Sequence, residues 1–156
     1  MKLRYAAVVV PILAVVLTAA GWSRDEGSNT TIRVVERATT DTVVDIGPTG
    51  DSPGDVLAFA NQVYDMHNQA VVGSDNGHCI RTATSGDAAW ECFWTLLLSK
   101  GQITVEGPFF DTHDSVLAIT GGTGAFRQAR GEMTLHSRNA AGSEYDFIYR
   151  LNGARG

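Results

Sequence analysis

The sequence has no excess of positive charge. Twelve lysine and arginine residues stand against 17 aspartate and glutamate residues, and the formal net charge is −5 at pH 7. Proteins that bind nucleic acid present a basic surface to the phosphates, so DNA and RNA are excluded as expected partners. Charged residues make up 19% of the 156 residues and apolar residues 44%. That composition is typical of one globular domain, neither a disordered chain nor a membrane bundle.

Motifs for metals, phosphates and covalent catalysis are also missing. The four histidines are scattered, without metal-ligand spacing: His67, His78, His113 and His136. The stretch Gly50–Gly54 fits G-x-S-x-G, but the residue after the serine is Pro53, which has no N–H for an oxyanion hole. The glycines of Gly121–Gly124 are not followed by Lys-Ser/Thr. No metal and no cofactor are expected.

The one long apolar run stands at the N-terminus. Lys2 and Arg4 precede the apolar residues Ala6–Leu17, and small residues follow at Thr18–Ala20. The run is shorter than the roughly 20 residues of a membrane-spanning helix, so it predicts a secretory signal over residues 1–20. The alternative is an uncleaved anchor. We expect a polar leader over 21–30, a single domain over 31–156, and a secreted protein that leaves the membrane after cleavage.

Two cysteines follow in this exported chain. Export brings Cys79 and Cys92 to a compartment where disulfides persist. A hairpin with a two-residue turn at Ser85-Gly86 would pair them directly, at a non-hydrogen-bonded position where Cα atoms approach to about 4.5 Å. The sequence therefore predicts a Cys79–Cys92 disulfide, and two free thiols are the alternative.

Short runs of alternating apolar and polar residues fill the rest of the chain. Ile103 and Val105 alternate with polar neighbours, as do Met133 and Leu135, and the run Tyr145–Leu151 does so with one interruption. Such runs predict about eight half-buried antiparallel strands. With short connections, they favour an all-β fold: an eight-stranded antiparallel barrel with a small apolar lumen. The irregular segment 41–55 is expected either to cover the barrel mouth as a lid or to be a solvated connector.

Four segments resemble allene oxide cyclase. They are QITVEGPFF (Gln102–Phe110), DSVLAITGGTGAF (Asp114–Phe126), GEMTL (Gly131–Leu135) and YDFIYRL (Tyr145–Leu151). The glycine-rich stretch Gly121–Gly131 is also similar to plant dirigent proteins, which share the same barrel. The resemblance covers roughly residues 31–153. It implies an eight-stranded barrel without cofactor, often trimeric, so a homotrimer is one expected assembly.

The resemblance also implies functional residues. In the cyclase, which closes a five-membered ring on an unstable fatty-acid epoxide, a first-strand glutamate stabilises positive charge and an asparagine holds the epoxide oxygen through a water. Glu36 and Asn61 match these two residues, and Cys79 matches a pocket cysteine. A family tyrosine is replaced by Phe109. Dirigent proteins, by comparison, steer the coupling or cyclisation of phenolic intermediates.

The residue pattern leads to the same positions independently. Glu36 shares the face of Ile32 and Val34, and Asn61 shares the face of Phe59 and Val63. A carboxylate on an apolar face is costly unless it is paired, protonated or functional. Arg81, on the face of Cys79, is one candidate partner for it; the alternatives are a rim-exposed Glu36 and an Asn61 that only satisfies backbone groups. Further expected pocket residues are Phe59, Cys79, Arg81, Trp94, Phe109, Tyr145 and Tyr149.

Three functions remain open from the sequence. The first is an exported, cofactor-free isomerase or cyclase that folds a small apolar substrate in the lumen. The second is a non-catalytic barrel, dirigent-like or lipocalin-like, that binds or templates an apolar ligand. The third is a structural or interaction protein whose lumen is plugged by side chains, with Trp90 and Trp94 the expected plugs.

Overall fold

The computed structural model describes residues 29–152, so the predicted signal segment 1–20 and nearly all of the leader lie outside the described residues. This part of the chain forms nine strands and one short 3₁₀ helix. Their bounds are β1 Thr30–Arg37, β2 Thr42–Val44, β3 Val56–Tyr64, β4 Val71–Ala83, β5 Ala89–Leu98, β6 Gly101–Phe110, β7 Ser115–Gly122, η1 Gly124–Phe126, β8 Gly131–Ser137 and β9 Glu144–Leu151. No helix in residues 29–152 could span a membrane.

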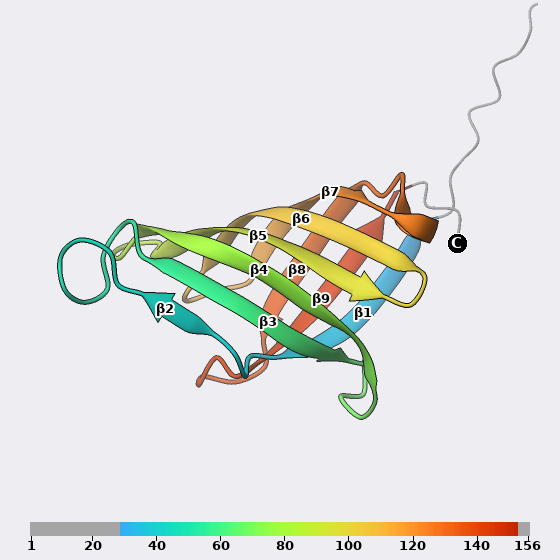
Figure 1. Cartoon of the computed structure of the whole chain (residues 1–156), viewed down its shortest axis with the longest axis horizontal. Helices are drawn as coiled ribbons and strands as arrows, with labels where there is room; N and C mark the ends of the chain where they lie inside the picture. Colours follow the sequence, from blue (N-terminus) through green and yellow to red (C-terminus); the bar gives the residue numbers. More distant parts are fainter. Residues whose placement is uncertain (1–28, 153–156) are drawn as a thin grey trace, which may run out of the picture.

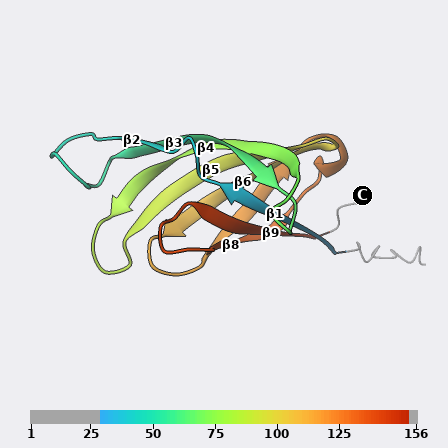
Figure 2. The same cartoon turned by 90° about the horizontal axis from the view of Figure 1, so that it is seen from below.

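The strands close into a barrel. The strands β3 to β9 pair antiparallel in succession. β9 then pairs with β1, and β1 pairs with β3 to close the ring (Figure 1). The short strand β2 pairs with the first residues of β3, beyond the end of β1 (Figure 2). The eight strands β1 and β3–β9 therefore form the closed antiparallel barrel that the sequence predicts.

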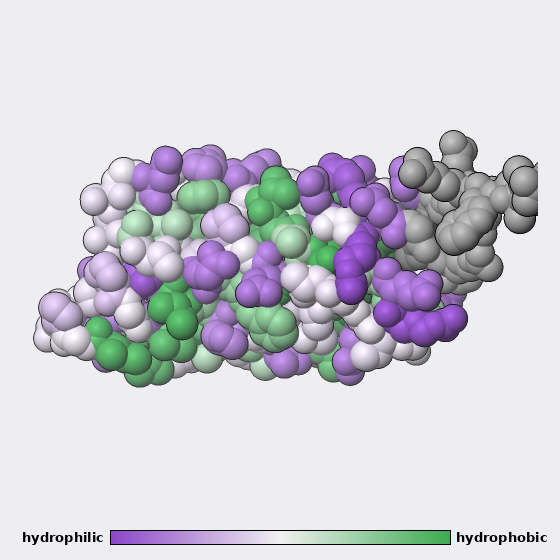
Figure 3. Space-filling model, turned by 90° about the horizontal axis from the view of Figure 1, so that it is seen from above, coloured by the Kyte–Doolittle hydropathy of each residue, from purple (hydrophilic) through white to green (hydrophobic). Residues whose placement is uncertain are grey.

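Alternation along the strands places the core inside the barrel. In β5 the side chains of Trp90, Cys92, Trp94 and Leu96 are buried, whereas Glu91 and Phe93 between them are exposed. The same period of two holds in β6, β8 and β9, because successive side chains of a strand point to opposite faces. Hydrophobic residues are scattered among hydrophilic ones over the exterior seen from above (Figure 3).

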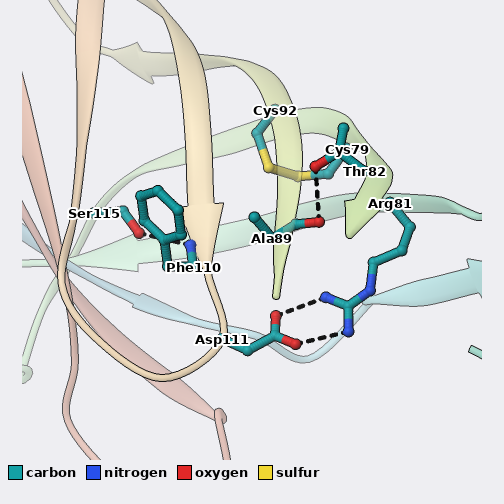
Figure 4. The surroundings of a disulfide bond; sticks show 8 residues. All are labelled: Cys79, Arg81, Thr82, Ala89, Cys92, Phe110, Asp111 and Ser115. Atoms are coloured by element: carbon teal, nitrogen blue, oxygen red, sulfur yellow. Dashed lines mark hydrogen bonds and ion pairs between the residues drawn. A yellow bond between two sulfur atoms is a disulfide. The ribbon is translucent and has the colours of Figure 1, made fainter. Parts of the chain in front are cut away.

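The hairpin of β4 and β5 has the predicted register but a different turn. Cys79 lies directly opposite Cys92, their Cα atoms are 4.0 Å apart, and a disulfide joins them (Figure 4). The predicted two-residue turn at Ser85-Gly86 is wrong: the strands are joined by the five residues 84–88. A β-bulge at Thr82, whose hydroxyl donates to the carbonyl of Ala89, shifts the pairing back by one residue. Two deviations therefore cancel at the cysteine pair.

One end of the barrel, which we call the mouth, is surrounded by the segments 38–55, 84–88, 111–114 and 138–143. Asp55 fixes the longest of these segments. Its carboxylate accepts hydrogen bonds from the backbone N–H of Ile46 at 2.8 Å and of Ser52 at 2.9 Å. Its own backbone carbonyl accepts a bond from the N–H of Arg81. The irregular segment predicted as a lid or connector is thus an ordered loop beside the mouth.

Candidate functional site

The lumen contains a cavity of about 30 Å³ close to the mouth. Its position follows from the strands, since Glu36 stands near the end of β1, Phe109 near the end of β6 and Tyr145 near the start of β9. A larger hollow of about 360 Å³ lies at the mouth and shares Phe109, Leu135 and Tyr145 with the inner cavity. The inner cavity is lined by Glu36, Asp41, Leu57, Phe59, Cys79, Cys92, Trp94, Phe109, Leu135, Tyr145 and Phe147.

Aromatic side chains fill the lumen below the cavity. The indole N–H of Trp94 donates a hydrogen bond to the hydroxyl of Tyr149 at 3.2 Å, and both residues are buried. The ring centroid of Trp94 lies 5.3 Å from that of Phe147 and 6.1 Å from that of Phe59. Gly77 lies opposite Trp94 on the neighbouring strand, and a Cβ there would collide with the Trp94 side chain. The site is therefore a shallow apolar chamber above a packed floor.

Glu36 is the polar group of this apolar chamber. Its side chain is on the wall and only 5% of the residue is exposed. Asn61, on the adjacent strand β3, donates a hydrogen bond from Nδ2 to Glu36 Oε1 at 2.9 Å. Burial raises the pKa of Glu36 well above its ordinary value, and the nearby carboxyl of Asp75 raises it further.

Asn61 uses all of its hydrogen-bonding groups within the protein. Its second Nδ2 proton goes to Asp41 Oδ1 at 2.8 Å. Its Oδ1 accepts bonds from the backbone N–H groups of Thr39 and Thr40 and from the Thr40 hydroxyl, at 2.9–3.0 Å. Asn61 thereby holds the break between β1 and β2 and orients Glu36. Asn61 therefore both satisfies backbone groups, as one of the predicted alternatives has it, and contacts Glu36.

Asp75 is a second carboxyl in contact with Glu36. The register of β3 and β4 brings it there, because Asp75 lies directly opposite Asn61. The residue is 1% exposed, and neither carboxyl oxygen has a hydrogen-bond partner among the described residues. Burial is the main cause that raises the pKa of Asp75 to about 7. Burial and the charges of Glu36, Asp41 and Asp111 also raise the pKa of Tyr145 to about 12.

Arg81 does not pair with Glu36, so that candidate ion pair is corrected. Its guanidinium binds Asp111 and Asp51 instead, with N–O distances of 2.7 Å to each (Figure 4 shows the Asp111 contact). It also stacks over the ring of Trp90. Arg81 is absent from the lining of the inner cavity and lies on a separate hollow at the mouth with Asp51, Asp55 and Trp90. Its role here is to tie two loops to the barrel.

The structure brings most of the predicted site residues together. Glu36, Phe59, Cys79, Trp94, Phe109 and Tyr145 all line the one cavity. Asn61 stands behind Glu36, Tyr149 lies beneath Trp94, and Cys79 contributes a half-cystine rather than a thiol. Trp90 stacks with Arg81 near the mouth, so of the two expected plugs only Trp94 lies in the cavity wall.

Sequence reasoning missed two acids, Asp75 and Asp41. Asp75 carries the same signal as Glu36, because it lies on the inward face of β4 that continues through Gly77 and Cys79. Asp41 lies in an irregular segment, where no period indicates which way a side chain points. Within residues 29–152, no three His, Cys, Asp or Glu side chains are grouped so as to hold a metal ion.

A closed eight-stranded barrel with an acidic group in a small apolar lumen defines a class of proteins that handle small molecules. The sequence model of the allene oxide cyclase family matches residues 23–143, and the chain belongs to that family.

Solved structures of similar proteins share the barrel. A pyocyanin demethylase is 25% identical, with a TM-score of 0.66, and the match covers 76% of this chain and 98% of that one. A pterocarpan synthase dirigent protein is 18% identical, with a TM-score of 0.65 and coverage of 84% and 99%. An exo-specific intermolecular Diels–Alderase is 15% identical, with a TM-score of 0.66 and coverage of 81% and 100%. The last two likenesses show the fold alone.

Proposed function

We propose that the protein is an exported, cofactor-free isomerase or cyclase that folds a small apolar, reactive substrate in the barrel lumen. The observation that carries this proposal is the position of Glu36, a buried carboxyl on the wall of a cavity whose other lining residues, apart from Asp41, are apolar, aromatic or disulfide-bonded. Membership of the allene oxide cyclase family and the likeness to cyclising barrels support the same reaction class.

In this proposal the substrate occupies two compartments. The inner cavity of about 30 Å³ is large enough only for a small reacting group. The remainder of the substrate lies in the hollow of about 360 Å³ at the mouth, which the shared residues Phe109, Leu135 and Tyr145 join to the cavity. Confinement replaces a disordered chain by one folded conformer, which lowers the entropic barrier to ring closure.

Glu36 supplies the chemistry at the reacting group. Asn61 holds its Oε1, so the carboxyl has a fixed direction toward the cavity. In a site without bulk water, a carboxyl acts strongly on developing positive charge or on a proton that must be removed. No covalent intermediate is needed for either action.

Export is part of the proposal. The disulfide between Cys79 and Cys92 is compatible with an oxidising, extracytoplasmic compartment. The substrate in this proposal is therefore a molecule available outside the cytoplasm.

A cyclisation assay tests the reaction class. A fatty-acid allene oxide is generated in solution, and the ring product is analysed on a chiral column with and without protein. We expect one enantiomer in excess with the wild type. Glu36→Gln keeps the volume but removes the charge, so turnover falls by about 10²–10³ while binding of a fluorescent fatty acid is retained. Arg150→Ala is the control, because Arg150 is exposed on β9 away from the mouth and donates a hydrogen bond to the hydroxyl of Thr134 on the exterior. A racemic product with wild-type protein would contradict cyclisation of this substrate class.

A second candidate is a ligand-binding or templating barrel without catalysis. The observation in its favour is that the cavity walls other than Glu36 and Asp41 are apolar or disulfide-bonded, which is sufficient for binding. It predicts that Glu36→Gln and the wild type give the same product ratio at the same rate. The chiral assay therefore separates the two candidates.

A further inference from the structure

Two carboxyls stand side by side in the barrel without a cation. Asp75 and Glu36 are 1% and 5% exposed. Asp75 lies opposite Asn61 in the pairing of β3 and β4, and Asn61 donates a hydrogen bond to Glu36 at 2.9 Å, so the two carboxyls lie close enough to interact directly. Glu36 lines the inner cavity, whereas Asp75 is absent from its lining. No arginine, lysine or histidine within residues 29–152 forms an ion pair with either group.

The surrounding groups add negative charge or none. Asp41, from the segment after β1, faces the pair across the amide of Asn61. From β9, the phenols of Tyr145 and Tyr149 stay neutral, because both have pKa values raised by burial. From β5, Trp94 faces Tyr149 with its N–H. Asn61 can give Glu36 only one hydrogen bond, since its other proton is taken by Asp41.

Two ionised carboxyls in contact would therefore lack compensation. Like charges at this separation in a buried site cannot both form without a large cost, and a shared proton removes that cost. A proton between the two groups also supplies the hydrogen bond that the oxygens of Asp75 otherwise lack. The missing hydrogen-bond donor and the repulsion between like charges both favour a proton between the two carboxyls.

We propose that Asp75 is a positioning residue that shares one proton with Glu36, so that the two carboxyls act together as a single general base on the substrate. The proposal deepens the function proposed above and rests on it for the identity of the reaction, but the shared proton itself can be measured without a substrate.

The chemical step balances within the pair. A C–H or O–H bond of the substrate breaks, its proton forms an O–H bond on Glu36, and its electron pair stays on the substrate to form the new ring bond. The proton already held by the pair moves to Asp75, so both carboxyls end neutral, which burial favours. Return of one proton to another atom of the substrate restores the pair. No oxidant, reductant or further reactant is required.

The pair also explains how a buried acid is matched to neutral conditions. A general base is most effective when its apparent pKa is close to the working pH. The first proton leaves the pair near the value of about 7 for Asp75, while the pKa of Glu36 stays well above normal. Such values belong to the pair rather than to one residue. The base is available above about pH 7.

Infrared spectroscopy tests the shared proton on the full-length protein without substrate. Spectra are compared from about pH 5 to about pH 9, a range in which ordinary carboxyls are ionised. We expect a buried protonated-carboxyl band that persists at neutral pH. In Asp75→Asn the titration midpoint of Glu36 moves down by at least about one pH unit, because a neighbouring negative charge is gone. In Glu36→Gln/Asp75→Asn the band disappears.

Asp55→Asn is the matched control. Asp55 is as buried as Asp75 by exposed fraction, but backbone N–H donors lower its pKa, so its replacement leaves the band unchanged. Absence of the band in wild type at neutral pH, an unshifted midpoint in Asp75→Asn, or a band that survives in the double variant would each overturn the proposal.

Kinetics then connect the pair to catalysis. If the wild type converts the allene oxide, the acid limb of its rate against pH follows the first ionisation of the pair, whereas in Asp75→Asn it coincides with the single infrared midpoint of Glu36. A limb that stays in place would show that Asp75 has a structural role alone. A racemic product from wild type with an intact band would instead remove the proposed reaction and keep the pair.

Discussion

Two buried aspartates show how differently one side chain behaves in two regions of this barrel. Asp55 and Asp75 are each 1% exposed. At the mouth, the carboxylate of Asp55 accepts two backbone N–H bonds, and its pKa is lowered. In the lumen, Asp75 contacts Glu36, its pKa is raised to about 7, and its carboxyl oxygens have no hydrogen-bond donor among the described residues.

The comparison of Asp55 with Asp75 shows that hydrogen-bond donors and cations, rather than burial alone, determine the charge state of a buried acid. The same contrast holds for the neighbours. At the mouth, Arg81 binds Asp51 and Asp111, so negative charges are compensated there. In the lumen, Asp41 adds a further carboxyl beside Glu36. The ion pairs at the mouth therefore stabilise the fold, whereas the uncompensated carboxyls in the lumen are not needed for a stable fold.

Removal of the cation at the mouth is expected to have the largest effect on stability. Arg81→Leu leaves Asp51 and Asp111 without their partner and frees the loop that Asp51 anchors. We expect a loss of about 3–4 kcal/mol, in the lower part of the usual range for a broken buried pair because the two acids stay partly exposed. Urea denaturation measures it, and a change below about 1 kcal/mol would show that the pair behaves as a surface salt bridge.

Removal of the disulfide is expected to cost somewhat less. In Cys79→Ala/Cys92→Ala the unfolded chain regains the freedom of a short closed loop, which the chain-entropy model places at about 3 kcal/mol. The hairpin register is also set by the bulge at Thr82 and the barrel pairing, so the fold should persist. The measurement is the melting temperature of the double variant beside that of the wild type. An unchanged value would mean that the bridge adds nothing to the hairpin.

Enlargement of the lumen cavity should have a smaller effect, confined to binding. Phe109 lines both the inner cavity and the mouth hollow and packs against Tyr145, with ring centroids 5.9 Å apart. Phe109→Ala should therefore change affinity for a fluorescent fatty acid by about tenfold, equivalent to 1.4 kcal/mol. Arg150→Ala on the exterior of β9 should leave the affinity unchanged. Equal effects from both variants would place the ligand outside the lumen.

The sequence predicted the barrel and most of one wall of the site. Period-two alternation determines which side chains enter the lumen, so the amino-acid pattern alone places Glu36, Asn61 and Trp94 on inward faces. The cysteine pairing was predicted with the right register and the wrong turn, because the bulge that compensates for the longer turn has no signal in the periodicity.

The partners of the charged residues could not be predicted in the same way. Asp51 and Asp111 lie in loops, and only the pairing of strands β3 to β6 brings them to Arg81. Asp75 is different, since it lies two positions before Gly77 and four before Cys79 on the inward face of β4. The alternation that places Cys79 inward therefore also places Asp75 inward when it is extended toward the N-terminus. Its contact with Glu36, by contrast, depends on the register between β3 and β4, which the periodicity does not determine.

The pH dependence of stability tests the contrast between the two aspartates most directly. A group whose pKa is raised on folding binds its proton more tightly in the folded state, so wild-type stability should fall as pH rises from about 4 to about 7, with a slope of up to about 1.4 kcal/mol per pH unit for one proton. Asp75→Asn removes the carboxyl that binds this proton. The variant should therefore be more stable than wild type at about pH 8, by about 2–4 kcal/mol.

Asp55→Asn should behave in the opposite way. The pKa of Asp55 is lowered on folding, so its contribution is present above the unfolded-state pKa and disappears as pH falls. The variant should therefore be less stable than wild type at neutral pH, with the two curves converging in acid. Urea denaturation of the three proteins over the same pH series gives the result. Curves for Asp75→Asn and Asp55→Asn that run parallel, or a destabilised Asp75→Asn at about pH 8, would contradict an uncompensated carboxyl pair in the lumen.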